Sequence, residues 1–274
     1  MKFLAQVIEQ IEEAAVQIDK QTITGSRLAL ILMDNVIEIL MYNLTKAELS
    51  FEDFEAIIKD TFEEKYPDFN NKTQLALSDE KISQDQKDIL DICHSYRNEA
   101  YHLNKLHDGI ICQIVKLHFQ ICCEIIPNLL ERGGSFNNEK DPILSKYGIS
   151  SYDILFSHGK LGELMKKISA GREYNQKDFS KSLTLDIELR VKKACKDLKE
   201  IQNDQNYYKD FESCLKSFSS RAKKLKTKNK ESNALKSYFK LDQDLLKIEL
   251  NIDLISSYID YETDLAIDRY REGI

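Results

Sequence analysis

Turn-forming residues are scarce in this chain, and their scarcity limits the folds it can adopt more than any other feature. Nine glycines and three prolines stand among 274 residues, whereas Leu, Lys, Glu, Gln and Ala are plentiful and charged residues make up 31%. The plentiful residues are good helix formers, while glycine and proline are the usual residues of turns. We therefore expect an all-α fold.

The charge of the chain limits how it can bind nucleic acid. Its formal net charge is −7 and its isoelectric point is about 5.4. A protein that coats nucleic acid through its overall charge is basic, so any RNA binding here must depend on a local cationic site.

The location of the protein is predicted from what the sequence lacks. The longest strictly apolar run, residues 28–33, is much shorter than the roughly 20 apolar residues of a membrane-spanning helix. The first residues form no signal core, and neither end carries a lipidation motif. We expect a cytoplasmic protein that has no membrane partner.

Six cysteines are present, and they form no CxxC pair and no repeated spacing. Cys122 and Cys123 are adjacent, and on a helix they would point about 100° apart, which does not suit one tetrahedral ion. We expect buried, reduced thiols that pack as small apolar groups, with no metal site and no cofactor.

Apolar residues at helical spacing predict the order of the helices. A break is expected at Gly25 and Ser26, and a loop over residues 68–81. Pro127 should shorten the last turn of its helix. The expected helices are an amphipathic one over residues 3–19, a buried central one over 27–44, a short one over 51–63, a long one from 83 onward, and one over 110–130.

Two helical domains are expected. Residues 1–132 should form a bundle, 133–150 a linker with three glycines and a proline, and 151–274 an accessory domain for partner binding, sensing or dimer support. Within the second half, residues 183–191 and 248–254 alternate as strands do. Both also satisfy longer helical stripes, so we favour helix over strand.

The helix that carries Arg97 has an unusual polar face. Its apolar residues, such as Ile89 and Cys93, share one side, and arginine, histidine and tyrosine on the other side suit a contact surface or an anion-binding cleft. Spacing alone favours a polar face that packs against a neighbouring helix or subunit. The outward residues are Tyr101, His94, Lys105 and Asn98, with Arg97 and His102 at the margins.

The sequence Arg97-Asn98-Glu99-Ala100-Tyr101-His102 resembles the signature of the HEPN superfamily, in which an arginine, commonly followed by a polar residue, precedes a histidine by a few positions. The helices before and after this motif, and the early buried helix that includes residues 26–35, also fit that family. The resemblance covers residues 1–132. It implies a four-helix bundle that forms a homodimer, with the two motifs meeting at the interface.

The resemblance also implies an activity, that of a metal-independent endoribonuclease. His102 would act as a general acid or base on the ribose 2′-hydroxyl or the leaving 5′-oxygen. Arg97 would bind the scissile phosphate and offset its growing charge, and Asn98 would orient these groups. From the helical face alone, we add Tyr101, Lys105 and His94 as substrate-binding or supporting residues.

The family suggests partners and a biological role. RNA is the expected substrate, and a toxin or antiphage-defence effector with an antitoxin or regulatory partner is the expected context. Some HEPN toxins carry a tyrosine two residues after the histidine that an antitoxin modifies, and here that position is Asn104. Two alternatives stay open: a non-catalytic HEPN-like dimer that binds RNA, a nucleotide or a partner protein, and a purely structural module.

Two further features of the sequence have both a structural and a functional interpretation. His118 lies in an apolar helix, where a core histidine with satisfied hydrogen bonds is expected. Residues 221–230 carry six cations in ten positions. We expect a solvated turn between two helices there, with contact to RNA phosphates as the alternative.

Overall fold

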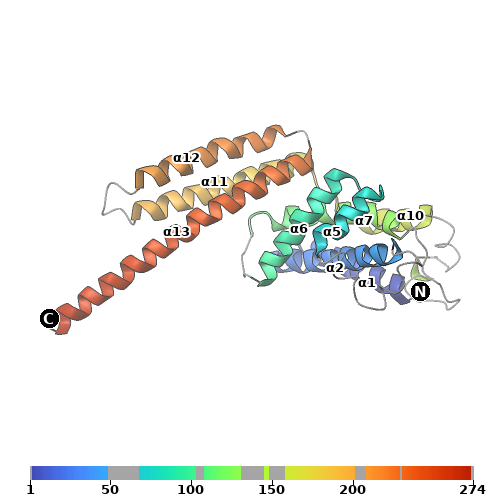
Figure 1. Cartoon of the computed structure of the whole chain (residues 1–274), viewed down its shortest axis with the longest axis horizontal. Helices are drawn as coiled ribbons and strands as arrows, with labels where there is room; N and C mark the ends of the chain where they lie inside the picture. The colour runs from blue at the N-terminus through green and yellow to red at the C-terminus, as the bar shows by residue number, and fades with distance from the viewer. Residues whose placement is uncertain are drawn as a thin grey trace. The chain divides into compact units, whose positions relative to one another are not determined.

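The computed structural model confirms the all-α class: helices alone make up the regular structure of the residues it describes, which are 2–48, 68–102, 108–130, 145–147, 158–200, 208–228 and 230–272 (Figure 1). The chain divides into two compact units between Asn175 and Gln176. The first unit contains α1 (Lys2–Asp19), α2 (Ile23–Glu48), α5 (Phe69–Ser78), α6 (Gln84–His102), α7 (Ile111–Leu129) and α10 (His158–Ser169). The second contains α11 (Gln176–Glu200), α12 (Tyr208–Lys223), the 3₁₀ helix η2 (Lys224–Thr227) and α13 (Glu231–Glu272).

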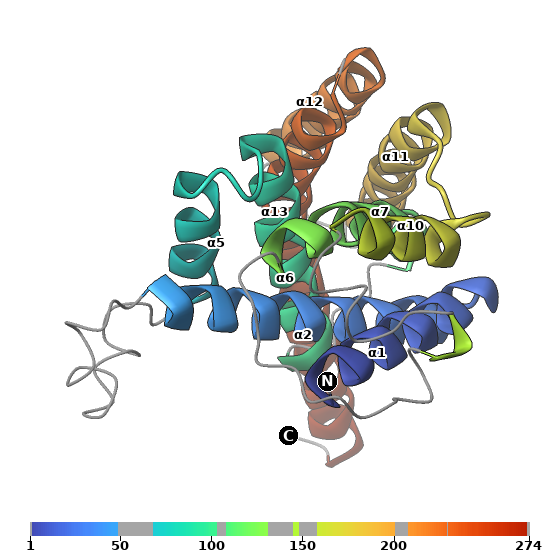
Figure 2. The ribbon, with the colours of Figure 1, turned by 90° about the vertical axis from the view of Figure 1, so that its right-hand side faces the viewer.

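Helix α2 is the centre of the first unit, because α1, α5, α6 and α7 all pack against it (Figure 2). By length and composition its segment 23–45 could cross a membrane, although more than half of it is buried inside the bundle. The length of the longest strictly apolar run was therefore too narrow a criterion for excluding a membrane-spanning helix. A buried core helix passes the same test, and Asp34 stands fully buried near its middle.

The start of α2 differs from the predicted break at Gly25 and Ser26. The helix begins at Ile23, and the N–H of Gly25 donates to Thr22 Oγ1 at 3.0 Å, so Thr22 caps the helix. A Cβ added to Gly25 would lie 2.6 Å from the carbonyl oxygen of Gln17. This glycine thus permits the end of α1 to approach α2 closely and does not interrupt the helix.

Helix α5 replaces the loop predicted over residues 68–81. The carboxylate of Asp68 accepts from the N–H of Asn71 at 2.7 Å and caps the helix. The apolar stripe is short and includes a polar position, which is why periodicity alone missed it. The buried residues are Phe69, Thr73 and Ala76. The helix predicted over residues 51–63 lies outside the described residues.

The boundary between the units falls later than the predicted linker, residues 133–150. Helix α10 packs on α7 and α1 and so belongs to the first unit, because its apolar face is buried there. Arg172, which follows α10, binds both carboxylate oxygens of Asp19 at 2.8 and 2.5 Å. Lys146 Nζ contacts Glu12 Oε1 at 2.7 Å. Most of the predicted linker lies outside the described residues.

In the second unit, α11, α12 and α13 pack on one another. Residues 183–191 and 248–254 lie inside α11 and α13, so the preference for helix is confirmed. Exposure shows why: Leu183 and Ile187 are fully buried, but Leu185 and Leu189 are 49% and 57% exposed. A half-buried strand would place all four side chains on one face.

An ion cluster joins α11 to α13. Arg190 donates to the two carboxylate oxygens of Glu249 at 3.0 and 2.7 Å, and it also contacts the buried Asp242. Tyr238 donates to Asp186 at 2.6 Å. Burial raises the pKa of Asp186, and burial together with the charges of Asp242 and Asp186 raises that of Tyr238. The cluster therefore fixes how the two helices pair.

Candidate functional site

A fully buried carboxylate, Asp34 of α2, holds two side chains of the motif helix α6. His94 Nδ1 lies 3.0 and 3.1 Å from its two oxygens. Arg97 Nε lies 3.3 Å from Oδ2 and forms an ion pair that lacks hydrogen-bond geometry. Because a buried carboxylate is costly unless it is paired, Asp34 requires these partners and fixes their positions.

The rest of the Arg97 guanidinium contacts Asn98 and Glu38. Nη1 donates to Asn98 Oδ1 at 2.8 Å, and Nη2 lies 3.8 Å from Glu38 Oε2. The Arg97 side chain is 24% exposed and that of Glu38 is 38% exposed. The result is a partly exposed, oriented cation that can meet an anion, with Glu38 as its competing partner.

His94 does not lie on an open face, contrary to the prediction. Its ring stacks on Phe69 of α5, with centroids 4.1 Å apart and an interplanar angle of 3°. On its other side it contacts Asp34. Spacing along α6 predicts an outward position for His94. That side is covered by α5, a helix in the segment for which the sequence predicts a loop. His94 thus holds Asp34 from inside the bundle.

Helix α5 also covers the preceding turn of this face. Lys87 is almost fully buried and donates to Asn70 and Asp91, both at 2.6 Å. Thr73 donates to the other oxygen of Asp91 at 2.9 Å. Of the predicted polar face, His94 therefore lies at a helix–helix contact, as one alternative from the sequence had allowed, and this contact continues toward the start of α6 through Lys87 and Asp91.

The second half of the motif is described only in part. Helix α6 extends to His102, so the whole motif lies on one helix, as predicted. Asn98 is half-buried beside Arg97. The side chains of Tyr101 and His102, and all of Lys105, lie outside the described residues. The structure thus brings Arg97, Asn98 and His94 together.

Sequence analysis missed Asp34, which organises this site. Its signal was present: a single carboxylate follows directly on the apolar run 28–33, within a helix predicted to be buried. A carboxylate in such a place must find a cation or hydrogen-bond donors. The neighbouring helix supplies both, from one turn of α6.

A second buried polar group, His118 of α7, lies near the same cluster. Burial lowers its pKa to about 4, although the charge of Asp34 opposes this. The prediction that this histidine is buried in the core is correct. The prediction that its hydrogen bonds are satisfied is wrong, since neither ring nitrogen has a hydrogen-bond partner among the described residues. His118 is therefore neutral near neutral pH.

The cysteines of the described residues are free thiols. Burial, with a contribution from Asp34, raises the pKa values of Cys93 and Cys122 well above the usual range. Such thiols are poor nucleophiles and poor metal ligands. In the part of the chain that the structure describes, no group of three or more His, Cys, Asp or Glu is arranged to hold a metal.

No model of a known protein family matches this chain, and no curated protein or solved structure matches it either. The functional assignment therefore depends on the chemistry of the residues on α2 and α6.

Proposed function

We propose that this protein is a metal-independent endoribonuclease of HEPN type, in which Arg97 and His102 act on one phosphodiester. The observation that supports this most is the state of Arg97. A buried carboxylate orients it, its side chain is 24% exposed, and it stands five positions before His102 on the same helix. A guanidinium held in this way can bind a phosphate and offset the charge that develops on it.

The proposed reaction needs two proton transfers. One histidine accepts the proton of the ribose 2′-hydroxyl as that oxygen attacks phosphorus. A second imidazole donates a proton to the leaving 5′-oxygen, the P–O5′ bond breaks, and a 2′,3′-cyclic phosphate forms. Imidazole suits both roles because it titrates near neutral pH. Two copies of His102, one from each subunit of a homodimer, would supply the pair.

The contact between Glu38 and Arg97 has a consequence for binding. At 3.8 Å, and with both side chains partly exposed, it is a weak ion pair. A phosphate that binds the outer nitrogens of Arg97 displaces Glu38, while the inner contact to Asp34 stays in place. Substrate thus replaces one carboxylate and does not dismantle the site.

The test is cleavage of total cellular RNA by the purified protein in EDTA. We expect the wild type to cleave, and His102→Ala to lose roughly a hundredfold or more of the rate, the usual contribution of a general acid or base. Arg97→Lys should lose most of the activity because lysine keeps the charge and lacks the fork.

The matched control is Arg172→Lys, which alters a surface ion pair with Asp19 in the same unit and should cleave like the wild type. Cleavage that persists unchanged in His102→Ala would mean that a contaminating nuclease is responsible. It would also remove the support for His102 as the general acid or base.

A second candidate is a non-catalytic helical dimer that binds RNA, a nucleotide or a partner protein. The observation that favours it is that all three guanidinium nitrogens of Arg97 already have protein neighbours, namely Asp34, Glu38 and Asn98. Binding of RNA without cleavage by either the wild type or His102→Ala would support it. A role as a toxin or antiphage effector with an antitoxin partner follows from the family resemblance and is part of the first proposal.

A further inference from the structure

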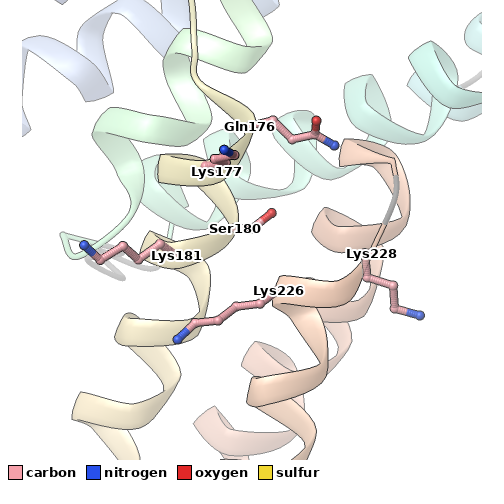
Figure 3. A pocket seen from close by; sticks show the side chains of 6 residues that line it. All are labelled: Gln176, Lys177, Ser180, Lys181, Lys226 and Lys228. Atoms are coloured by element: carbon pink, nitrogen blue, oxygen red, sulfur yellow. The ribbon is translucent and has the colours of Figure 1, made fainter.

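The second unit has a groove that the proposed nuclease site does not use. It lies between the first turns of α11 and the segment of η2, and its volume is about 570 Å³ (Figure 3). Four of the six described residues that line it are lysines. The lining residues are Gln176, Lys177, Ser180, Lys181, Lys226 and Lys228.

The groove combines two separate parts of the sequence. Lys226 and Lys228 belong to the basic stretch 221–230, whereas Lys177 and Lys181 come from α11, far away in the chain. The stretch is thus more than a solvated turn, because a second pair of cations faces it. In contrast, Arg221 of the same stretch lies 3.5 Å from Asp244 and does not line the groove.

Three of these lysines are not neutralised within the described part of the chain. Lys181, Lys226 and Lys228 are exposed, and no carboxylate among the described residues contacts them. Unpaired ammonium groups that share one groove repel each other, and an anion between them relieves that repulsion. The charge of the groove therefore favours a ligand with several negative charges.

The side chains of the groove differ in direction. In Figure 3, Lys226 extends from η2 toward α11, and the hydroxyl of Ser180 lies between the two elements. Lys181 and Lys228 extend outward at opposite sides of the groove. The amino end of α11, which begins at Gln176, adds the positive end of a helix dipole.

The chemistry of the lining selects the class of ligand. None of the described residues that line the groove has an aromatic or large apolar side chain, so they offer nothing on which a base could stack and no wall for an acyl chain. Lysines act as point charges that bind phosphates without reading a base sequence. The volume is within the range of ordinary ligand sites and exceeds the space that one phosphate needs.

We propose that this groove binds the phosphate backbone of single-stranded RNA, without preference for base sequence. Because the protein is acidic overall, binding is local and sensitive to salt. The proposal concerns a site distinct from Arg97 and His102, and it holds whether or not the protein cleaves RNA.

The test is fluorescence anisotropy of the full chain with a labelled 2′-O-methyl oligouridylate. This probe lacks the free 2′-hydroxyl that the proposed cleavage requires, so binding is measured separately from cleavage. The variant is Lys181→Gln with Lys226→Gln. The control is Lys192→Gln with Lys193→Gln, which removes the same charge from exposed positions on the same helix.

We expect the groove variant to bind roughly tenfold more weakly than the wild type. The slope of log affinity against log salt should become less steep by about 1.4, since each phosphate contact to a single strand contributes about 0.7. The control should match the wild type in affinity and in salt slope, and circular dichroism should show equal helix content in all three proteins.

Three results would overturn the proposal. The first is that the wild type shows no salt-dependent binding, and the second is that the control variant weakens binding as much as the groove variant does. The third is that inorganic tripolyphosphate displaces the probe as well as unlabelled oligouridylate does at equal phosphate concentration. That result would reassign the groove to small polyphosphates. Because none of the variants alters Arg97 or His102, these results are distinguishable from a failure of the nuclease proposal.

Discussion

Single residues of the first unit are placed by the requirements of buried polar groups. Asp34 has no exposed surface, and it is satisfied by His94 and the ion pair with Arg97. His118, which lies near it, has no hydrogen-bond partner among the described residues. One buried group is thus paired and orients the candidate site, while the other costs stability because its nitrogens lose their water.

His118→Leu tests this cost and its dependence on pH. The pKa of His118 is about 4 in the folded chain against a usual 6.5, so the unfolded chain binds the proton more tightly. The contribution of this histidine to stability is therefore fully present above pH 6.5 and is lost as the pH falls toward 4. Over that window the free energy of unfolding of the wild type should fall by up to about 3 kcal/mol more than that of the variant.

The measurement is urea unfolding of both proteins across the window. At neutral pH we expect the leucine variant to be as stable as the wild type or about 1 kcal/mol more stable, because two unpaired nitrogens are removed. Identical pH profiles for the two proteins would show that His118 is hydrated or hydrogen-bonded in solution.

At the scale of elements, polar contacts between helices decide which faces meet. α5 covers part of the polar face of α6 through Phe69, Thr73 and Asn70, and α11 pairs with α13 through Arg190. Burial by itself lowers the pKa of Arg190, but the hydrogen bonds that Arg190 donates to Glu249 and the charge of Asp242 outweigh it and raise that pKa. Arg190 therefore stays charged and linked to α13.

Arg190→Lys should destabilise the second unit by about 2 kcal/mol. Lysine keeps the charge, but it cannot bind both oxygens of Glu249 while contacting the buried Asp242, so one carboxylate loses its partner. The control is Arg221→Lys, whose pair with Asp244 is exposed and should be worth less than about 1 kcal/mol. Urea unfolding followed by circular dichroism measures both, and equal midpoints for the two variants would contradict the importance of the cluster.

At the scale of the whole molecule, each unit has a core of its own. In the second unit, side chains from α11, α12 and α13 are buried together, and the division falls between Asn175 and Gln176. The fully buried ones include Leu183, Ile187, Leu215, Leu235, Tyr238 and Leu245. A segment with its own core is able to fold alone.

We therefore expect residues 176–274, expressed alone, to be helical and to unfold cooperatively in urea. A matched fragment that begins at residue 151, where the sequence predicted the second domain, should gain little, because the apolar face of α10 is buried against α7 and α1 of the first unit. An unfolded 176–274 fragment, or one rescued by the additional residues, would contradict the boundary.

The sequence by itself determined the helical class, the approximate positions of α1, α2, α6 and α7, and helix at residues 183–191 and 248–254. These are local properties: a period of 3.6 residues and the scarcity of glycine and proline can be read without knowing any partner. It also indicated which helix carries the motif from Arg97 to His102. The roles of those two residues stay predictions.

Tertiary structure alone decided which faces are covered. Phe69 and Thr73 are weak signals of a helix until α6 is beside them, and the position of His94 follows from α5. The pairing of Asp34 with Arg97, and the meeting of α11 with the basic stretch at the groove, likewise join residues far apart in the sequence. Burial and ion pairing depend on neighbours that chain folding brings together, and no local pattern encodes them.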